Sequence, residues 1–385
     1  MPSPPTDSHF KLAARAASEG KLTIFLGAGA NFAQQSTNRV YGANANFLPT
    51  GVELAEYLAT EFGYQLPTHV ATAIGDPEPA PANDREKTLA TVLRKTFIDD
   101  LGKVSQHAQA QDPGALNGTL HDIFSRDYPL THLHKTLAAL PSRCPFNRRP
   151  VFITTNYDTM MEQALAAANE PFDILYYRTP GPSNPVWLYH WKNAHHYYQQ
   201  PYSERADIPQ DPIDHELPIP DLANYSDLPL GNNKRTDSDE LEDKDRARTL
   251  IVKIHGTVSP KGREHSTFIL TPDDYIQFLR LVSLRTPLPT TLFSRLLETH
   301  FLFLGYGLGD WNILAICQNL WSQRTSPNFN NWAVQFKPTD ADVARWNSTG
   351  PAGRISVFDQ NVTDYAKALD AKFAPAPTPG APVTP

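Results

Sequence analysis

Cysteine is almost absent from this sequence. The 385 residues contain two cysteines, Cys144 and Cys317, and no pair with the C-x-x-C spacing. Two thiols cannot build a four-cysteine zinc site or a disulfide framework. We therefore expect a cytoplasmic protein, made for a reducing compartment, that holds no metal.

The sequence also lacks long apolar runs and an excess of basic residues. No stretch approaches the roughly 20 apolar residues of a membrane-spanning helix, and the N-terminus has no signal-peptide core. Lysine and arginine total 34 against 41 aspartates and glutamates, for a formal net charge of −7. Nucleic-acid surfaces need clustered cations. We therefore expect a soluble, unprocessed protein with no direct nucleic-acid binding and no membrane attachment.

Proline, in contrast, is abundant and unevenly placed. The 35 prolines gather in the first five residues, in 76–82, through 180–230 and in the tail after 374. Proline breaks helices and cannot donate to a sheet ladder, so these segments are loops or disordered ends. The predicted organisation is a flexible N-terminus at 1–10, one domain at 11–373, and a disordered proline-rich tail at 374–385.

Short apolar β-forming runs alternate with helical patterns, which is typical of βαβ units around a parallel sheet. The stronger runs are apolar almost throughout, as strands buried on both faces are. We predict an α/β fold with a Rossmann-like parallel sheet and helices on both of its faces. The expected strands are 22–26, 151–154, 172–176, 250–254, 301–304 and 332–335, with 355–358 as a weaker seventh.

The remaining segments are expected to be helices or loops. Apolar residues at helical spacing predict helices at 10–18, 51–62, 159–168, 272–281 and 311–320, and an added helical layer at about 85–140. Residues 178–249 show neither a helical nor a strand period and are rich in tyrosine, proline and mixed charge. We interpret them as a large loop-rich insertion, partly disordered or ordered only against a partner.

The first expected strand runs into glycine. In KLTIFLGAGAN, Gly27 and Gly29 would let backbone amides approach an anionic diphosphate without an intervening Cβ. The standard dinucleotide fingerprint would need a third glycine where this chain has Phe32. An ordinary tight turn therefore remains an equal alternative for this motif alone.

The second strand ends in five polar side chains, in FITTNYD. Ligands of open α/β sheets bind beyond the carboxyl ends of strands, where Thr155, Asn156 and Asp158 would project. Capping of the helix expected from residue 159 is the alternative, and one side chain is expected to do this. A cap needs one polar residue, so the others favour a binding site.

Two further strands end in similar motifs. His255 follows the apolar run of LIVKIHGT and should lie at the same sheet edge, although a lone histidine after a strand is more often structural. FLFLGYGLGDWNI places glycines at 305, 307 and 309 before Asp310, which suits ribose or phosphate contacts. A glycine-rich turn capped by Asp310 is the alternative, but it does not explain why such strand ends recur.

In this order the four motifs resemble the sirtuin-like, or silent-information-regulator-type, NAD-binding domain. The resemblance spans about 22–335, although 63–149 and 178–249 match poorly, and it makes 11–373 a catalytic domain. It implies that Asn156 and His255 are catalytic, with Asn156 at the nicotinamide ribose and His255 as the general base. The NAD-binding residues that it implies are Gly27, Ala28, Gly29, Ala30, Asn31, Thr155, Asp158, Gly305, Tyr306 and Asp310.

Two departures narrow the expected activity. Protein deacylases of the family carry a four-cysteine zinc ribbon, which this chain cannot form. The ITTNYD and GYGLGDWNI segments instead resemble bacterial sirtuin-like effectors of anti-phage defence, which hydrolyse NAD. Nicotinamide leaves NAD as a neutral molecule, so such a site needs no general acid, and its transition state resembles that of glycoside cleavage.

The resemblance therefore implies an NAD hydrolase that acts in abortive infection, with NAD as its substrate and no metal. Such an enzyme must stay silent until infection, so we expect a homo-oligomer or a controlling partner, with a HerA-type hexameric ATPase as one candidate. A deacylase or ADP-ribosyltransferase without the zinc ribbon remains an alternative. A non-enzymatic module that senses NAD or ADP-ribose is the other.

Overall fold

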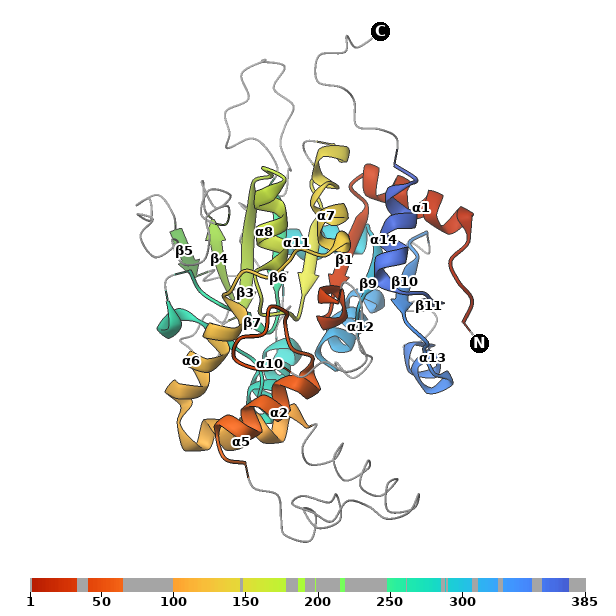
Figure 1. Ribbon diagram of the computed structural model, residues 1–385. Coiled ribbons are helices and arrows are strands. Elements are labelled where there is room, and N and C mark those ends of the chain that lie inside the picture. Colours follow the sequence, from red (N-terminus) through yellow and green to blue (C-terminus); the bar gives the residue numbers. More distant parts are fainter. Residues whose placement is uncertain are drawn as a thin grey trace, which may run out of the picture.

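The fold is built on one large sheet that separates two layers of helices. A third helical layer lies beyond the carboxyl ends of the strands (Figure 1). The computed structural model describes residues 2–32, 41–64, 100–145, 148–177, 186–190, 198, 215–218, 248–260, 262–284, 288, 290–306, 311–324, 328–347 and 355–373. The tail expected to be disordered, 374–385, lies outside these residues.

The nine strands of the sheet lie in the order β11-β10-β9-β1-β2-β6-β3-β4-β5. Neighbouring strands are parallel from β11 to β3. Every strand expected from the apolar runs is present within this parallel part, which confirms the Rossmann-like α/β class. The bounds are β1 (Leu22–Leu26), β2 (Val151–Thr154), β3 (Phe172–Tyr177), β6 (Thr249–Lys253), β9 (His300–Leu304), β10 (Asn331–Gln335) and β11 (Ile355–Asp359).

The strand order changes direction at β1. On one side of β1 the sheet continues through β2, β6 and β3, and on the other side through β9, β10 and β11. In an open α/β sheet, the crevice beyond the carboxyl ends of the strands around such a reversal is the usual place for a ligand. The topology therefore directs attention to the segments that follow β1, β2, β6 and β9.

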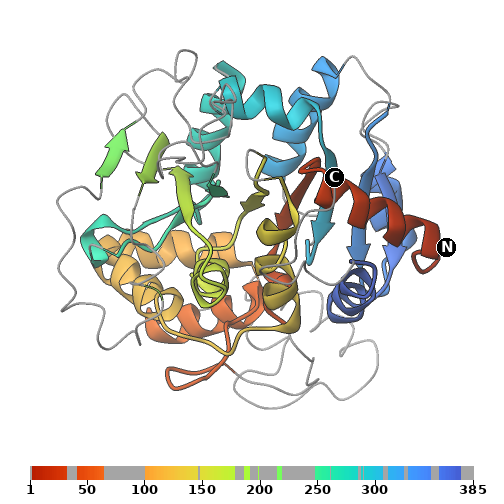
Figure 2. The ribbon, with the colours of Figure 1, turned by 90° about the horizontal axis from the view of Figure 1, so that it is seen from above.

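Helices cover both faces of the sheet because successive strand side chains point to opposite faces (Figure 2). Ile24 and Phe152 pack into a core with α1, α7, α8 and α14. Phe25 and Ile153 pack on the other face with α10, α11 and α12. The bounds are α1 (Asp7–Ser18), α7 (His132–Ala138), α8 (Met160–Ala167), α10 (Pro272–Leu284), α11 (Thr290–Leu297), α12 (Trp311–Gln323) and α14 (Val362–Asp370), with α13 (Asp340–Asn347) between β10 and β11.

The N-terminus differs from the expected flexible segment at 1–10. Helix α1 begins at Asp7, and the Thr6 side chain caps it by accepting a hydrogen bond from the His9 amide. The His9 ring is buried and bonds through Nε2 to the Tyr365 hydroxyl at 2.8 Å. Residues 7–10 are therefore helical, because a cap and an aromatic contact fix them.

The insertion at 178–249 also differs from its prediction. Within it, β4 (Val186–His190) and β5 (His215–Pro218) extend the sheet by antiparallel pairing from β3, and Thr249 already belongs to β6. Proline hid these strands from the sequence pattern, yet an edge strand tolerates proline at its end, as Pro218 in β5 shows. The segments 178–185, 191–197, 199–214 and 219–247 lie outside the described residues.

The added helical layer lies beyond the carboxyl ends of the strands and consists of α2 (Gly51–Glu61), α5 (Leu101–Gln111) and α6 (Pro113–Phe124) (Figure 1). It differs from the layer expected at 85–140, because α2 joins it and α7 instead covers a face of the sheet. Its core joins Leu54, Val104 and Leu120 to Tyr157 and Met160, which follow β2. The first part of the expected helical block, 85–99, lies outside the described residues. No helix in the described part of the chain is long and apolar enough to cross a bilayer.

Candidate active site

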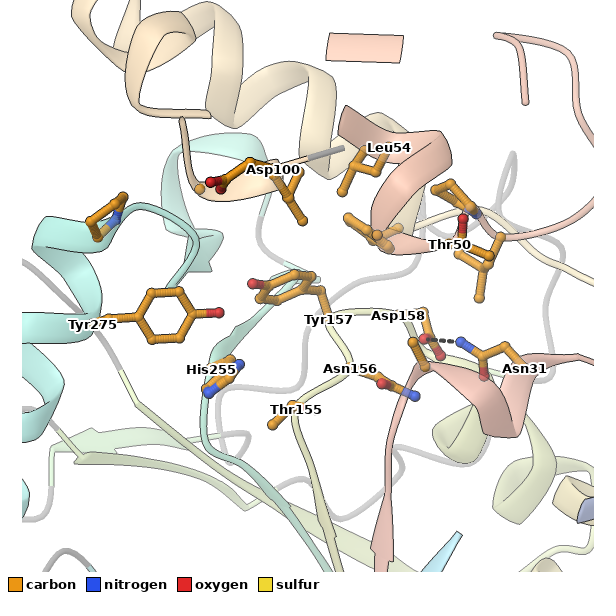
Figure 3. Close-up of a pocket in the computed structure, with 18 of the residues that line it drawn as sticks. Asn31, Thr50, Leu54, Asp100, Thr155, Asn156, Tyr157, Asp158, His255 and Tyr275 are labelled. Carbon is orange, nitrogen blue, oxygen red and sulfur yellow. Dashed lines mark hydrogen bonds between the residues drawn. The ribbon is translucent and has the colours of Figure 1, made fainter. Parts of the chain in front are cut away.

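A cavity of about 800 Å³ opens at the carboxyl edge of the sheet, between the strand ends and the added helical layer. Small-molecule and cofactor sites typically measure roughly 300–1,000 Å³. Figure 3 shows His255 and Tyr275 on one side of this cavity and Asn31 with Asp158 on the other. The lining residues that the sequence singles out are Ala28, Asn31, Thr155, Asn156, Asp158 and His255.

The wall of the cavity that faces the strand ends is made by the first turns of three helices. Thr50, Gly51 and Leu54 come from the start of α2, residues 100–102 from the start of α5, and Pro272, Tyr275 and Ile276 from the start of α10. The positive ends of three helix dipoles therefore face one space, which favours negative charge on a ligand. None of these residues was a candidate in the sequence.

Local signals for these helix starts do exist in the sequence. Thr50 and Glu53 form a capping box, in which each side chain bonds to the other residue's amide, at 3.0 and 2.7 Å. Asp100 caps α5 through a 3.2 Å bond from the Lys103 amide. These patterns predict where each helix begins, but they do not predict that the three starts meet.

The glycines after β1 pack against the loop after β9. A Cβ at Gly27 would lie 2.6 Å from the Gly305 carbonyl oxygen, and one at Gly29 would lie 2.8 Å from the same atom. The Gly29 amide donates to that oxygen at 2.9 Å, and the Gly27 amide donates to Leu304 at 3.0 Å. Both amides are therefore hydrogen-bonded within the protein, and the absence of a Cβ at each glycine is required by the contact between the loops. NAD binding by Gly27 and Gly29 stays a prediction.

The other predicted residues of these two loops lie away from the described cavity. Ala30 is fully buried in the core around α1, and the buried Tyr306 packs with Phe303 on the opposite face of the sheet. Gly305 has a φ of +68° and touches the GAG loop, as described above. Asp310 lies outside the described residues. NAD binding by this group stays a prediction.

The loop after β2 holds its polar side chains in defined roles. Thr154 Oγ1 donates to Leu26 O at 2.7 Å and accepts from the Asn156 amide at 3.0 Å. Asn156 Nδ2 donates to Gly27 O at 3.1 Å, which fixes the orientation of the amide group. Its Oδ1 makes no hydrogen bond with the described residues, so this oxygen is left to accept one from a ligand.

Asp158 joins the loops after β1 and β2. Its Oδ1 accepts from the amide of Met160, the first residue of α8, at 2.9 Å, whereas Thr159, at the N-cap position, makes no capping bond through its side chain. Its Oδ2 accepts from Asn31 Nδ2 at 2.8 Å (Figure 3). A carboxylate only accepts, so Asn31 must present Oδ1 elsewhere, and that buried oxygen has no partner among the described residues.

A neutral histidine lies behind this pair. His134 is buried, bonds through Nδ1 to Thr131 Oγ1 at 2.7 Å, and feels the charge of Asp158. Burial lowers the pKa of His134 to about 4, and the nearby Asp158 carboxylate only partly opposes this. The His134 side chain is therefore uncharged at neutral pH.

His255 is held at the other side of the cavity. The residue is 4% exposed, its carbonyl accepts from the Ile269 amide at 2.8 Å, and its ring meets the Tyr275 ring edge-on at 5.4 Å. Gly256 follows with a φ of +89°, where a Cβ would collide with the Thr267 carbonyl. The glycine of this motif is therefore required to turn the chain immediately after the histidine.

The cavity thus offers amide oxygens, an imidazole and helix N-termini around a largely apolar space. Its lining, within the residues that the structure describes, includes Asp100 and Asp158 but no lysine or arginine. No group of three or more metal-ligating side chains occurs among the described residues. The arrangement suits a polar organic ligand whose anionic part is bound by backbone and helix dipoles.

The comparison with known families agrees with this geometry. Residues 150–350 match the family described as SIR2-like domain. The matched segment contains the strand ends that carry Asn156 and His255, whereas the GAGAN loop precedes it. No curated protein sequence matches the chain. A SIR2-like domain is consistent with an enzyme that uses NAD.

Proposed function

The chain belongs to the SIR2-like family, and on this premise we propose that it hydrolyses NAD to nicotinamide and ADP-ribose. The observation that carries the proposal is the convergence of Asn156 and His255, from the ends of β2 and β6, on one cavity. The helix starts that face them suit the diphosphate of a dinucleotide. Asn31 Oδ1, buried without a described partner, is a further acceptor near this space.

The residues can divide the work of hydrolysis. Nicotinamide departs as a neutral group, so the main demands are to stabilise positive charge on the ribose and to activate water. Asn156 Oδ1 can accept a hydrogen bond from a ribose hydroxyl or from the water. Histidine is the side chain best suited to take up a proton near neutral pH, which gives His255 the role of general base.

We also propose that the activity serves anti-phage defence by abortive infection in the cytoplasm, under the control of a homo-oligomer or a partner such as a HerA-type ATPase. The support is the resemblance of the ITTNYD and GYGLGDWNI segments to bacterial effectors. An enzyme that depletes NAD must be inactive in healthy cells. Assaying the chain alone and together with the products of neighbouring genes tests this control.

The test of the hydrolase is direct. The purified chain is incubated with NAD, and nicotinamide and ADP-ribose are followed by chromatography. Release without an acyl peptide should fall by about 100-fold or more in Asn156→Ala and His255→Ala, since each removes a group that acts in the transition state. The matched controls are Asn319→Ala and His265→Ala, both outside the cavity, and both should retain activity.

The other outcomes point elsewhere. Binding of NAD without turnover in every preparation overturns the hydrolase in favour of a sensor of NAD or ADP-ribose. Release that requires an acyl-lysine peptide indicates a deacylase. Transfer of labelled ADP-ribose to protein, in place of free ADP-ribose, indicates a transferase.

A further inference from the structure

A lysine is buried beneath the candidate active site. Lys253, the last residue of β6, is 1% exposed, and its ammonium lies within the fold. The ammonium donates to Asp158 O at 2.6 Å, to Thr257 Oγ1 at 3.1 Å and to Tyr157 O at 3.3 Å. One cation therefore binds the loop after β2 and the turn after β6 at the same time.

The charge of this lysine is balanced inside the protein. Glu162, in the first turn of α8, is also 1% exposed, and its Oε1 lies 2.6 Å from Lys253 Nζ. Burial raises the pKa of Glu162, while the neighbouring ammonium opposes this rise and favours the carboxylate. Two charges removed from water are expensive unless their geometry is defined and further hydrogen bonds are made. Lys253 meets this condition through its three oxygen acceptors, whereas the Glu162 carboxylate has, among the described residues, only its contact with the ammonium.

The atoms that Lys253 binds are those that support the site. Asp158, whose carbonyl accepts from the ammonium, also bonds through its side chain to Asn31 and to the Met160 amide. We call the hydrogen bonds from Lys253 to the loop after β2 and to Thr257 the lysine clamp. Asn156 lies two residues before Asp158, and His255 lies two residues after Lys253. The Ile254 amide donates to Thr154 O at 3.0 Å, so β2 and β6 remain paired up to the clamp.

We propose that Lys253, neutralised by Glu162, is a positioning residue that sets the placement of Asn156 relative to His255. The expected change in kcat rests on the proposed NAD hydrolysis. The expected change in the position of the loop does not. Lys253 is too deeply buried to be placed in contact with the substrate, and it acts through the backbone of the loop that carries Asn156. A displacement of about 1 Å in such a loop can lower the rate by about 100-fold.

The test replaces the ion pair with apolar side chains of similar length. Replacing a buried ion pair by apolar residues is often neutral for stability, so the double variant E162M/K253M should fold, while its loop carbonyls lose their common donor. We expect kcat for NAD to fall by about 100-fold, with KM changed less than about threefold, because the binding surface stays. A crystal structure should show residues 155–158 displaced from the end of β6.

The matched control lies at the other end of the same strand. Arg248 precedes β6 and pairs with the buried Asp173 at 2.9 Å, far from the cavity in the direction of the strand. The double variant D173M/R248M also loses a buried ion pair beside β6. It should keep kcat and keep residues 155–158 in place, whatever it loses in thermal stability.

The two readouts separate this inference from the proposed function. If the wild type binds NAD but never cleaves it, hydrolysis fails, while the loop position in the crystal structures still tests the clamp. An E162M/K253M protein with an undisplaced loop, or with wild-type kcat, overturns the inference. If this variant does not fold, the double variant E162Q/K253Q replaces it, because it also removes both charges and its amide at position 253 can still donate to one loop carbonyl, so kcat should fall only in part.

Discussion

Gly305→Ala should destabilise the protein through contact between two loops. Gly305 has a φ of +68°, and a Cβ there would lie 2.5 Å from Gly29 C and would collide with the Ala30 amide. The left-handed backbone costs an alanine about 1–2 kcal/mol, and loss of the Gly29 to Gly305 hydrogen bond costs about 1 kcal/mol. Overpacking adds about 1–3 kcal/mol. The expected loss of unfolding free energy is therefore roughly 3–6 kcal/mol.

Gly63→Ala is the matched control for this substitution. Gly63 has a φ of +59°, but no described atom lies within 4 Å of the position of its Cβ. It should lose only the backbone contribution of about 1–2 kcal/mol. Urea denaturation of the two variants, extrapolated linearly to water, measures the difference. If Gly305→Ala is no less stable than Gly63→Ala, the close packing of the two loops does not require glycine and the reasoning is refuted.

Two smaller predictions concern the helix start at the cavity and the buried histidines. Thr50→Ala removes half of the capping box of α2 and should lower the free energy of unfolding by about 1 kcal/mol, whereas Thr60→Ala on the same helix should change it little, as urea midpoints will show. Stability should also fall between about pH 6.5 and pH 4, by up to about 1.4 kcal/mol per pH unit for each buried histidine, and this slope should be shallower in His300→Gln. The buried histidines concerned are His9, His134 and His300, and desolvation lowers the pKa of each to about 4. As the pH falls below 6.5, the unfolded state therefore takes up protons before the folded state does. A free energy of unfolding that stays constant over this range contradicts the prediction.

The sheet could be predicted because its strands are buried on both faces. Runs such as 151–154 and 301–304 must be apolar almost throughout, and that requirement is visible in a single sequence. The same logic failed for β4 and β5, which lie among the prolines of 180–230 that led us to expect loops there. It also failed at the N-terminus, where the partners of His9 are more than 300 positions away, at Tyr365.

The site could be predicted only in part, for a related reason. Polar residues at the ends of β2 and β6 stand out because nothing in a strand requires them, and Asn156, Asp158 and His255 do line the cavity. The opposite wall depends on where α2, α5 and α10 pack, and no local pattern encodes their meeting. The role of Gly27 was also hidden, because the sequence shows that a Cβ is missing but not which atom takes its place.

The pairing of β1 has a consequence for synthesis of the chain. Leu22 pairs with His300 on one side, and Thr23 pairs with Val151 on the other. The strand that begins the site must therefore wait for most of the polypeptide before both of its edges are covered, and long-range pairing of this kind is slow. A nascent chain shorter than about 300 residues therefore holds β1 with one edge unpaired. The strand on which the cavity is built therefore gains its second partner only late in the synthesis of the chain.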